Sequence, residues 1–309
     1  MRKTHTILVS AVLGLSAAAG LAEPTSGVLS IQRLATIEDM GRMAVNPATG
    51  EIAFGRTGPG AAEAQFIRVL APNGMISQAG DVAIRDPDAV AWDMDGSFGP
   101  AGSILVGSNR GLFAITPGNH VNQFAWRGED LVNPEDLAMG ADGALYYADY
   151  GLGKVMRLSV HGSFSEMMAK PSVTRLDVGP AGQIVAVDLA GSLSSEAAAP
   201  EGRFGEIAFG DGSANWGEDR YTSDLDSGNL LRIDGSGHAS VLATGFLDGL
   251  GLEQGSLDAQ IGFMPTGEMV VGVSHTGAVY TLVPAPSSAV LAGLGVLLAA
   301  RRQRADRKA

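Results

Sequence analysis

The chain alternates between short apolar runs and turns that are rich in glycine and aspartate. The clearest example is residues 133–162, NPEDLAMGADGALYYADYGLGKVMRLSVHG. Two apolar segments, residues 136–139 and 144–149, flank a Gly-Ala-Asp-Gly turn, and a third, residues 154–159, follows another glycine-rich turn. Glycine and aspartate tolerate the positive φ angles that tight turns need. The pattern therefore predicts antiparallel strands joined by short connections.

The same unit recurs six times, and each copy opens on a short apolar strand whose central residue is usually small. These candidate inner strands are Met43-Ala44-Val45, Val90-Ala91-Trp92, Leu137-Ala138-Met139, Leu176-Asp177-Val178, Ile207-Ala208-Phe209 and Leu250-Gly251-Leu252. Their central residues are 47, 47, 39, 31 and 43 positions apart, which is typical of a β-propeller with one four-stranded sheet per unit. Small centres suit strands crowded around an axis. We expect an all-β, six-bladed β-propeller, with five or seven blades as the alternatives.

Further apolar segments follow each inner strand in a regular order. Second strands are expected at residues 51–55, 103–107, 144–148, 183–187, 219–223 and 268–272. Third strands are expected at residues 64–70, 111–115, 154–159, 192–195, 229–233 and 278–283. Fourth strands are expected at residues 75–78, 121–125, 163–168 and 239–244. The fourth unit thus lacks a clear outer strand.

The sixth unit ends at its third strand, so the ring needs one more strand from elsewhere in the chain. Residues 28–36, VLSIQRLAT, alternate apolar and polar side chains as a half-buried strand does. Pairing of this N-terminal strand with the last blade would close the propeller and leave few open strand edges.

The first 22 residues have the features of an export signal. Arg2 and Lys3 give a positive start, residues 7–18 are apolar, and small residues end at Ala22. We expect cleavage after Ala22, so that residues 23–283 form the propeller domain of an exported protein. An uncleaved anchor is the alternative.

Residues 284–309 form a three-part tail. A proline motif is followed by the apolar stretch 289–300, and the chain ends in a basic cluster. With its flanking serines the stretch has about 14 residues, or roughly 21 Å as a helix, against a bilayer core of about 30 Å. We expect a short transmembrane helix whose basic end stays cytoplasmic. The motif residues are Val283, Pro284, Ala285 and Pro286, and the basic residues are Arg301, Arg302 and Arg304.

The amino-acid composition excludes several kinds of site and partner. The chain has no cysteine, which excludes disulfides and thiolate metal sites and leaves stability to a large core. Its net charge is −12, and because both termini are basic, residues 23–300 carry −18. Such a surface repels phosphate backbones, so we expect no nucleic-acid partner. An acidic surface also attracts cations. The alternative is that the negative charge serves only to keep the protein soluble.

Two parts of the chain resemble known families. The segments NPEDLAMGADGALYYADYGLGKVMRL and FGEIAFGDGSANWGEDRYTSDLDSGNLLRIDGSG resemble blades of the NHL and gluconolactonase-like six-bladed propellers, over residues 30–283. The tail resembles the PEP-CTERM sorting signal of Gram-negative bacteria, although Ala285 stands where that family most often has glutamate. This resemblance implies an exosortase-type membrane protease as partner. It also implies tethering at the inner membrane before release to the cell surface or beyond. An ordinary C-terminal membrane anchor is the alternative.

Loops that enter inner strands and loops that leave second strands meet on one face of a propeller, around its channel. The entering positions are Gly41, Asp88, Glu135, Thr174, Gly205 and Asp248. The leaving positions are Arg56, Asn109, Asp149, Asp188, Asp224 and Ser274. We therefore predict an acidic channel mouth, whose oxygen atoms suit Ca²⁺. For Asp149, Asp188 and Asp224 the alternative is that each caps its own turn.

The gluconolactonase-like resemblance adds candidate metal ligands. Pro87-Asp88-Ala89-Val90-Ala91 and Pro134-Glu135-Asp136-Leu137-Ala138 match the family's inner-strand ligand motifs. Similarity therefore implies Asp88, Glu135 and Asn109 as ligands of a metal, and Asp248 is a further candidate by position. The family's N-terminal glutamate motif is not found on the first blade.

No catalytic constellation stands out. The sequence has no His-x-x-x-His pair, no Gly-x-Ser-x-Gly elbow and no phosphate loop. Trp92, Trp126 and Trp216 are expected to pack between blades rather than to serve as sugar platforms. The leading hypothesis is an exported binding protein whose partner is an extracellular polysaccharide or a surface protein. The alternative is a Ca²⁺-dependent, lactonase-like hydrolase.

Overall fold

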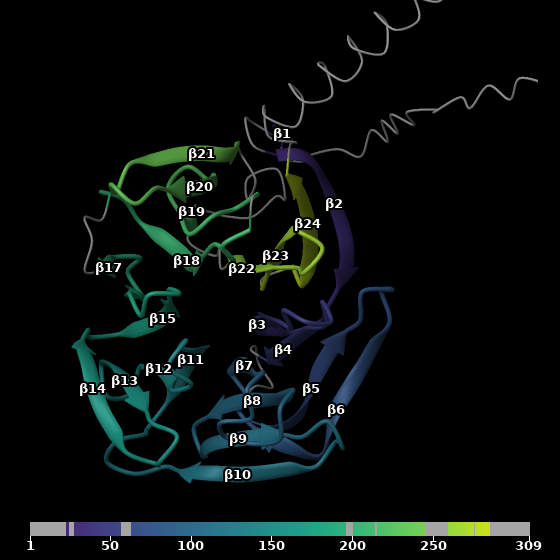
Figure 1. Ribbon diagram of the computed structural model, residues 1–309, viewed down its shortest axis with the longest axis vertical. Coiled ribbons are helices and arrows are strands. Elements are labelled where there is room, and N and C mark those ends of the chain that lie inside the picture. The colour runs from purple at the N-terminus through teal and green to yellow at the C-terminus, as the bar shows by residue number, and fades with distance from the viewer. Residues whose placement is uncertain are drawn as a thin grey trace, which may run out of the picture.

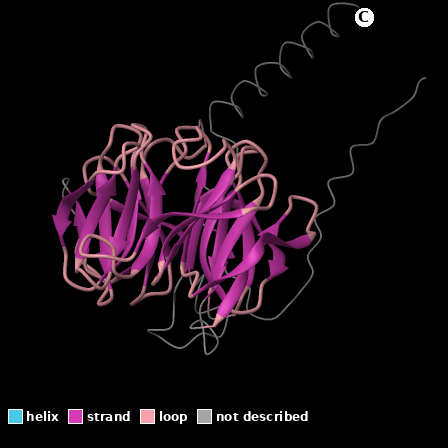
Figure 2. Ribbon diagram, turned by 90° about the horizontal axis from the view of Figure 1, so that it is seen from below, coloured by secondary structure: helices cyan, strands magenta, loops and turns pink. Residues whose placement is uncertain are grey.

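The computed structural model describes residues 23–24, 28–56, 63–195, 200–213, 215–244, 259–274 and 276–284. Over these residues the regular elements are strands, arranged as six antiparallel sheets around a central axis (Figure 1). Seen from the side, the sheets stand as the blades of a thick disc, with loops on both of its faces (Figure 2). The predicted six-bladed propeller is confirmed.

Each blade begins at the axis and runs outwards. The inner strands are β3 (Met40–Val45), β7 (Ala89–Asp93), β11 (Pro134–Met139), β15 (Val173–Val178), β18 (Phe204–Phe209) and β22 (Ala259–Phe263). The second strands are β4 (Ile52–Arg56), β8 (Ser103–Ser108), β12 (Leu145–Asp149), β16 (Ile184–Asp188), β19 (Arg220–Asp224) and β23 (Met269–Val273). The third strands are β5 (Ala64–Leu70), β9 (Gly111–Ile115), β13 (Lys154–Leu158), β17 (Leu193–Ser195), β20 (Leu230–Ile233) and β24 (Ala278–Pro284). The outer strands are β6 (Ile76–Arg85), β10 (Val121–Trp126), β14 (Phe164–Ala169) and β21 (Ala239–Thr244).

The ring closes as the sequence predicts. Strand β2 (Val28–Thr36) pairs antiparallel with β24 and becomes the outer strand of the sixth blade, with Ile31 opposite Leu282. A shorter strand that the sequence did not predict, β1 (Glu23–Pro24), adds to β21 on the fifth blade. The N-terminal segment therefore joins two blades, and its pairing covers two otherwise open edges.

A close backbone contact fixes this closure. Gly277 has φ +65°, and a Cβ added there would lie 2.0 Å from the carbonyl oxygen of Ile37. Replacing Gly277 by alanine should therefore lower the free energy of unfolding by several kcal/mol, since it combines a strained φ with a backbone clash (about 1 kcal/mol or more from φ alone). Gly162→Ala is the matched control, because its φ is +80° and nothing lies within 4 Å of the added Cβ. Denaturant melts compare the two variants, and equal losses would contradict the closure argument.

The sixth inner strand and the fourth blade were the two uncertain parts of the predicted ring. The sixth inner strand is β22, which pairs with β23. The prediction at Leu250-Gly251-Leu252 is therefore wrong, and those residues lie outside the described part of the chain. An apolar triplet with a glycine at its centre occurs at both places, so the pattern alone did not separate them. The fourth blade has three strands over its described residues, in the order β15-β16-β17.

The core lies between neighbouring blades. Side chains such as Leu105 and Leu112 of the second blade pack with Leu145, Tyr147 and Met156 of the third, and all are buried. A large set of such contacts replaces disulfides as the source of stability, since apolar burial contributes about 25 cal/mol per Å².

The three tryptophans take different positions. Trp216 is buried and packs against Tyr221 and Phe263, as predicted. Trp92 is half-buried and donates from Nε1 to the carbonyl of Ala44 at 3.0 Å, which links the first two blades. The prediction for Trp126 is wrong, because 74% of its side chain is exposed. It lies on the outer strand β10 just after a β-bulge, which turns it away from the core.

The export signal and most of the tail fall outside the described residues. Strand β24 ends at Pro284, where proline cannot continue a hydrogen-bonded ladder. Over the described part of the chain, no helix has the length and apolar character needed to cross a bilayer.

Candidate functional site: the central channel

Inner-strand carboxylates connect neighbouring blades along the axis. Asp136 on β11 accepts hydrogen bonds from the backbone N–H of Leu137 at 3.0 Å and of Leu176, on the next blade, at 2.9 Å. Asp177 on β15 repeats this arrangement. It accepts from the N–H of Val178 at 2.8 Å and of Phe209, again one blade further, at 2.6 Å. These carboxylates satisfy backbone donors that would otherwise be buried without a partner.

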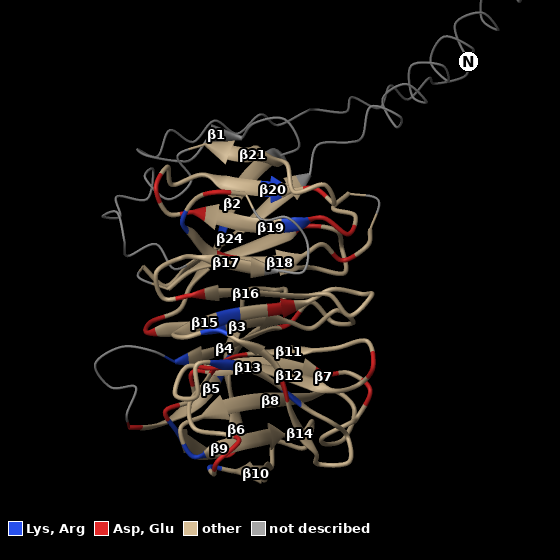
Figure 3. Cartoon of the chain, turned by 90° about the vertical axis from the view of Figure 1, so that its left-hand side faces the viewer, with Lys and Arg blue, Asp and Glu red and all other residues tan. Residues whose placement is uncertain are grey.

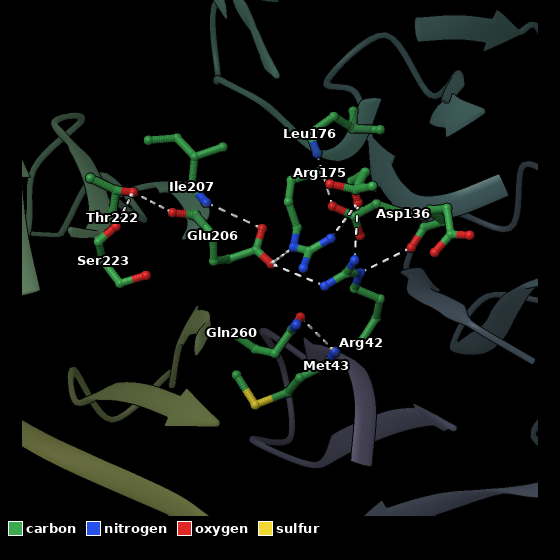
Figure 4. A network of polar contacts seen from close by, with 12 residues as sticks. Arg42, Met43, Asp136, Arg175, Leu176, Glu206, Ile207, Thr222, Ser223 and Gln260 are labelled. Atoms are coloured by element: carbon green, nitrogen blue, oxygen red, sulfur yellow. Dashed lines mark hydrogen bonds and ion pairs between the residues drawn. The ribbon is translucent and has the colours of Figure 1, made fainter. Parts of the chain in front are cut away.

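An arginine lies at the centre of the channel. Arg42 on β3 donates from Nε to the carbonyl of Glu135 at 3.0 Å and from Nη2 to the carbonyl of Thr174 at 3.1 Å. Its Nη1 lies 3.9 Å from a carboxylate oxygen of Glu206, and the Nε of Arg175 lies 3.5 Å from the same oxygen. Both Arg42 and Glu206 are buried. One guanidinium group from the first blade thus holds the third, fourth and fifth blades (Figure 4).

Gln260 on β22 completes this network from the sixth blade. With its amide oriented to suit both neighbours, its nitrogen donates to Glu206 at 3.2 Å and its oxygen accepts from Arg42 at 2.8 Å. The side chain is buried. We refer to the five side chains Arg42, Asp136, Arg175, Glu206 and Gln260 as the axial network.

Burial shifts the acidity of the channel carboxylates. It raises the pKa of Asp136 to about 7, against the opposing effects of the Arg42 charge and of two backbone N–H donors. It raises the pKa of Asp177 to about 7 as well, where the N–H groups of Phe209 and Val178 oppose the shift and the charge of Glu206 adds to it. Removal from water disfavours the charged form of a carboxyl, so both groups change protonation near neutral pH.

A cavity of about 310 Å³ occupies the channel beyond the axial network. Its walls come from all six inner strands, towards the ends at which those strands finish, and it reaches the exposed loop residues Pro47 and Asp95. Most of the lining is apolar. The polar side chains that it presents are Asp95, Asp136, Asp177, Glu206 and Gln260. A mostly apolar, concave site with a few fixed polar groups is the usual form of a small-molecule site.

The candidate metal ligands lie at the opposite end of the channel, where inner strands begin. Burial raises the pKa of Asp88 to about 8, and the charges of Glu135 and Asp86 add to the effect while Arg42 opposes it. Arg42 connects the two residues, because its backbone N–H donates to the carbonyl of Asp88 at 3.3 Å and its Nε donates to the carbonyl of Glu135 at 3.0 Å. The amide nitrogen of Asn109 donates to Asp86, and its Oδ1 is buried without a hydrogen-bond partner. Asp248 lies outside the described residues.

These donors do not form a complete metal site. Among the residues that the structure describes, no three His, Cys, Asp or Glu side chains converge closely enough to hold a metal ion. The guanidinium of Arg42, already a cation, interacts with Asp88. The described donors alone therefore do not complete a Ca²⁺ site.

The carboxylates at the ends of second strands bind backbone groups of nearby loops. Asp149 accepts from the N–H groups of Val132, Asn133 and Leu152 at 2.7–3.0 Å. Asp188 accepts from the N–H groups of Ala190 and Ser192, both at 2.9 Å, and from the Lys170 ammonium at 3.2 Å. Asp224 accepts from the N–H of Asp226 at 3.1 Å and from the hydroxyl of Ser227. This is the geometry of the turn-capping alternative.

The axial network was missed in the sequence although a signal for it exists. Each of its members stands directly before the apolar triplet of an inner strand, at the position that Ala89 takes in the second blade. Charged or amide residues at five of six equivalent positions are informative once the blades are aligned. Gln260 could not be found in this way, because the sixth inner strand was placed at residues 250–252.

The fold and site thus define a six-bladed β-propeller with a charged axis and a channel cavity. No protein-family model and no curated protein matches the chain. Among solved structures, a gluconolactonase from Xanthomonas campestris is 13% identical, with a TM-score of 0.61, covering 87% of this chain and 98% of its own.

Two other similar structures have different functions. Virginiamycin B lyase from Staphylococcus aureus is 13% identical, with a TM-score of 0.52, covering 82% of this chain and 99% of its own. An auxiliary nutrient binding protein from Bacteroides ovatus is 12% identical, with a TM-score of 0.57, covering 87% of this chain and 76% of its own. The gluconolactonase-like resemblance is confirmed for the fold alone, since one fold hosts many functions.

Proposed function

We propose that this protein is an exported, surface- or matrix-associated propeller that binds a small polar ligand in its channel cavity and performs no catalysis. One observation carries the proposal: Arg42, bonded to three blades at the centre of the channel, also donates hydrogen bonds to the backbone carbonyls of Asp88 and Glu135, the candidate metal ligands. The cavity on its other side is left as the concave site of the axis.

The side chains around the cavity suit binding better than chemistry. Asp136 and Asp177 each accept two backbone hydrogen bonds, and Glu206 is paired with arginines, so these groups are held in place. Over its described residues the lining holds no Ser, Cys, His, Lys or Tyr, so the candidate nucleophiles there are carboxylates, and those of Asp136, Asp177 and Glu206 are already hydrogen-bonded or ion-paired. Fixed acceptors on an apolar wall favour a ligand that combines hydrogen-bond donors with an apolar face.

Filling the cavity tests this proposal. Met94 lines the cavity, and replacing it by tryptophan should occupy part of its volume. In a thermal-shift screen of small polar metabolites, compounds that raise the melting temperature of the natural chain should lose the effect in Met94→Trp. Met75→Trp is the matched control, because Met75 is 68% exposed and is not part of the cavity lining. A ligand that stabilises all three proteins equally would contradict binding in the channel.

Export and processing form the second part of the proposal. The N-terminal signal and the PEP-CTERM-like tail support passage through the inner membrane and recognition by an exosortase-type protease. Mass spectrometry of the protein recovered from cells should show a start near Glu23 and loss of the segment after the proline motif. Recovery of the chain from Met1 to Ala309 would contradict processing at both ends.

A Ca²⁺-dependent hydrolase of lactones is the second candidate. The closeness of Asp88 and Glu135 and the unpartnered Oδ1 of Asn109 favour it. Under the binding proposal, millimolar Ca²⁺ should leave the melting temperature unchanged, as it should for Asp88→Asn. A rise that is lost in Asp88→Asn, together with turnover in a lactone panel, would favour the hydrolase instead.

A further inference from the structure

Figure 1 shows β6 and β10, the outer strands of the first two blades. A lateral groove is lined by residues of both strands. Its volume is about 480 Å³, and it shares no lining residue with the channel cavity. Two apolar side chains at its surface are unusually exposed, Trp126 at 74% and Val82 at 55%. Exposed arginines accompany them, at positions 85, 110 and 127. We call this set the Trp126 groove.

An insertion in β6 builds one wall. Gln65 of β5 pairs with Ile84 and Ile67 pairs with Ala79, so residues 80–83 have no partner on β5 and form an extended bulge. The bulge is tied to the second blade. The N–H of Gly80 donates to Asn119 Oδ1 at 2.7 Å, and Asp81 accepts from the N–H of Val121 at 3.0 Å. These bonds hold Val82 at the groove.

A second bulge fixes Trp126. The register of β10 against β9 shifts between Gln123 and Ala125, and the side chain between them, Phe124, packs inwards against Phe98 with ring centroids 5.3 Å apart. Trp126 itself pairs with Gly111, which has φ +138° and where an added Cβ would lie 2.1 Å from the carbonyl oxygen of Ala125. The backbone therefore keeps Trp126 pointing outwards at little further entropic cost on binding.

Backbone contacts in the same region hold two arginines, Arg110 and Arg127, beside the Trp126 side chain. The amide nitrogen of Gln123 donates to the carbonyl of Arg110 at 2.9 Å, and the N–H of Arg127 donates to that carbonyl at 3.2 Å. Both arginines are thus fixed by their backbone next to Trp126, while their charged ends are exposed.

Charge sets the groove apart from the rest of the molecule. The chain has a net charge of −12, and acidic residues lie in many loops along the blade edges (Figure 3). Among the described residues, the lining of the groove includes three arginines and no Asp or Glu. Asp81 bonds His120 and Val121, while Asp86 accepts from Asn109 and interacts with the charge of Arg85. The positive charge of the groove therefore rests mainly on Arg110 and Arg127. A locally cationic groove on an acidic protein selects an anionic partner.

We propose that the Trp126 groove binds a carboxylate-bearing saccharide, such as a chain of uronic acids. The apolar face of a pyranose ring stacks on the exposed indole, which offers a large flat surface. The planar guanidinium forks of Arg110 and Arg127 pair with sugar carboxylates through two parallel hydrogen bonds. This site does not depend on the channel cavity, and it gives the matrix association proposed above a specific surface and partner chemistry.

Binding of polygalacturonate to the mature full-length chain tests the assignment, by calorimetry at low and at high salt. Trp126→Ala should weaken binding about tenfold or more, as expected for a central aromatic contact. The double variant Arg110→Ala/Arg127→Ala should weaken it about as much and reduce its salt dependence. Trp126→Phe should restore part of the affinity. Dextran, which is neutral, should not bind.

Matched controls come from other exposed sites. Tyr150, which is 42% exposed, serves as the control aromatic residue for Trp126. Arg203, which is half-exposed and paired with Asp226, serves as the control for the groove arginines. Tyr150→Ala, Arg203→Ala and the cavity variant Met94→Trp should all bind polygalacturonate normally, so failure here is separable from failure of the channel proposal. Absence of binding, or equal binding by Trp126→Ala, would overturn the assignment. Equal affinity for polyglutamate would assign the groove to acidic peptides, and self-association lost in Trp126→Ala would assign it to a second copy of the chain.

Discussion

Replacing Arg42 by methionine is expected to lower the free energy of unfolding by about 3–5 kcal/mol, the usual result of breaking a buried ion pair from one side. The change leaves the Glu206 carboxylate buried with weaker compensation and removes the donor to the carbonyls of Glu135 and Thr174. Methionine fills a similar volume, so the loss reports the charge rather than a cavity. Denaturant unfolding followed by fluorescence measures it.

A second substitution separates pairing from packing. In Arg42→Met/Glu206→Gln the uncompensated carboxylate is gone, and we expect a clear part of the lost stability to return. Arg157→Met is the matched control, since Arg157 pairs with Asp142 at 2.7 Å on the surface, where such a pair contributes about 0–1 kcal/mol. If Arg42→Met and Arg157→Met lower the free energy of unfolding by equally small amounts, the axial network does not hold the blades together.

Raising the pH from about 5 to 8 is expected to lower the melting temperature. Burial raises the pKa of Asp88 to about 8 and those of Asp136 and Asp177 to about 7, above the ordinary value of 3.8. Between pH 4 and these values the folded chain binds more protons than the unfolded chain, so each unit of pH removes stability. The slope is at most about 1.4 kcal/mol per pH unit for each group.

One variant should flatten this profile. Asp88→Asn imitates the protonated carboxyl, so it should gain stability at pH 8 relative to the natural chain and differ little from it at pH 5. Asp234→Asn is the control, because hydrogen bonds from Ser236 and from the N–H of His238 lower the pKa of this exposed carboxyl instead of raising it. Thermal melting curves of the natural chain and both variants, recorded from pH 5 to 8, measure these differences. A melting temperature that rises over this range, or an Asp88→Asn profile parallel to the natural one, would contradict burial as the dominant effect.

Local pattern was sufficient for most of the architecture. The strands at Val28–Thr36, Ala64–Leu70 and Gly111–Ile115 have the predicted bounds, and five of the six inner strands contain the predicted triplets. Strand alternation and turn residues are properties of neighbouring positions, so they can be recognised without knowledge of the fold. Closure of the ring by pairing of β2 with β24 followed from counting strands.

The candidate site was harder to predict from the sequence than the strands were. The sequence predicted Asp88 and Glu135 at one mouth of the channel, but Arg42, which donates hydrogen bonds to the backbone carbonyls of both, was not considered. In the sequence, Arg42 lies 164 positions from Glu206 and 218 positions from Gln260, and no local period marks such partners. Alignment of the inner strands by their apolar triplets would have shown four of the five members of the axial network.

The sequence by itself determined the six units, the closed ring and the acidic character of the chain, because these depend on periodicity, turn chemistry and composition. Only the tertiary structure decided which charges meet at the axis, where the cavity lies and that Trp126 faces outwards. The first two depend on the convergence of six distant strands. The third depends on a single register shift in β10, which reverses the direction of a side chain without changing the apolar pattern.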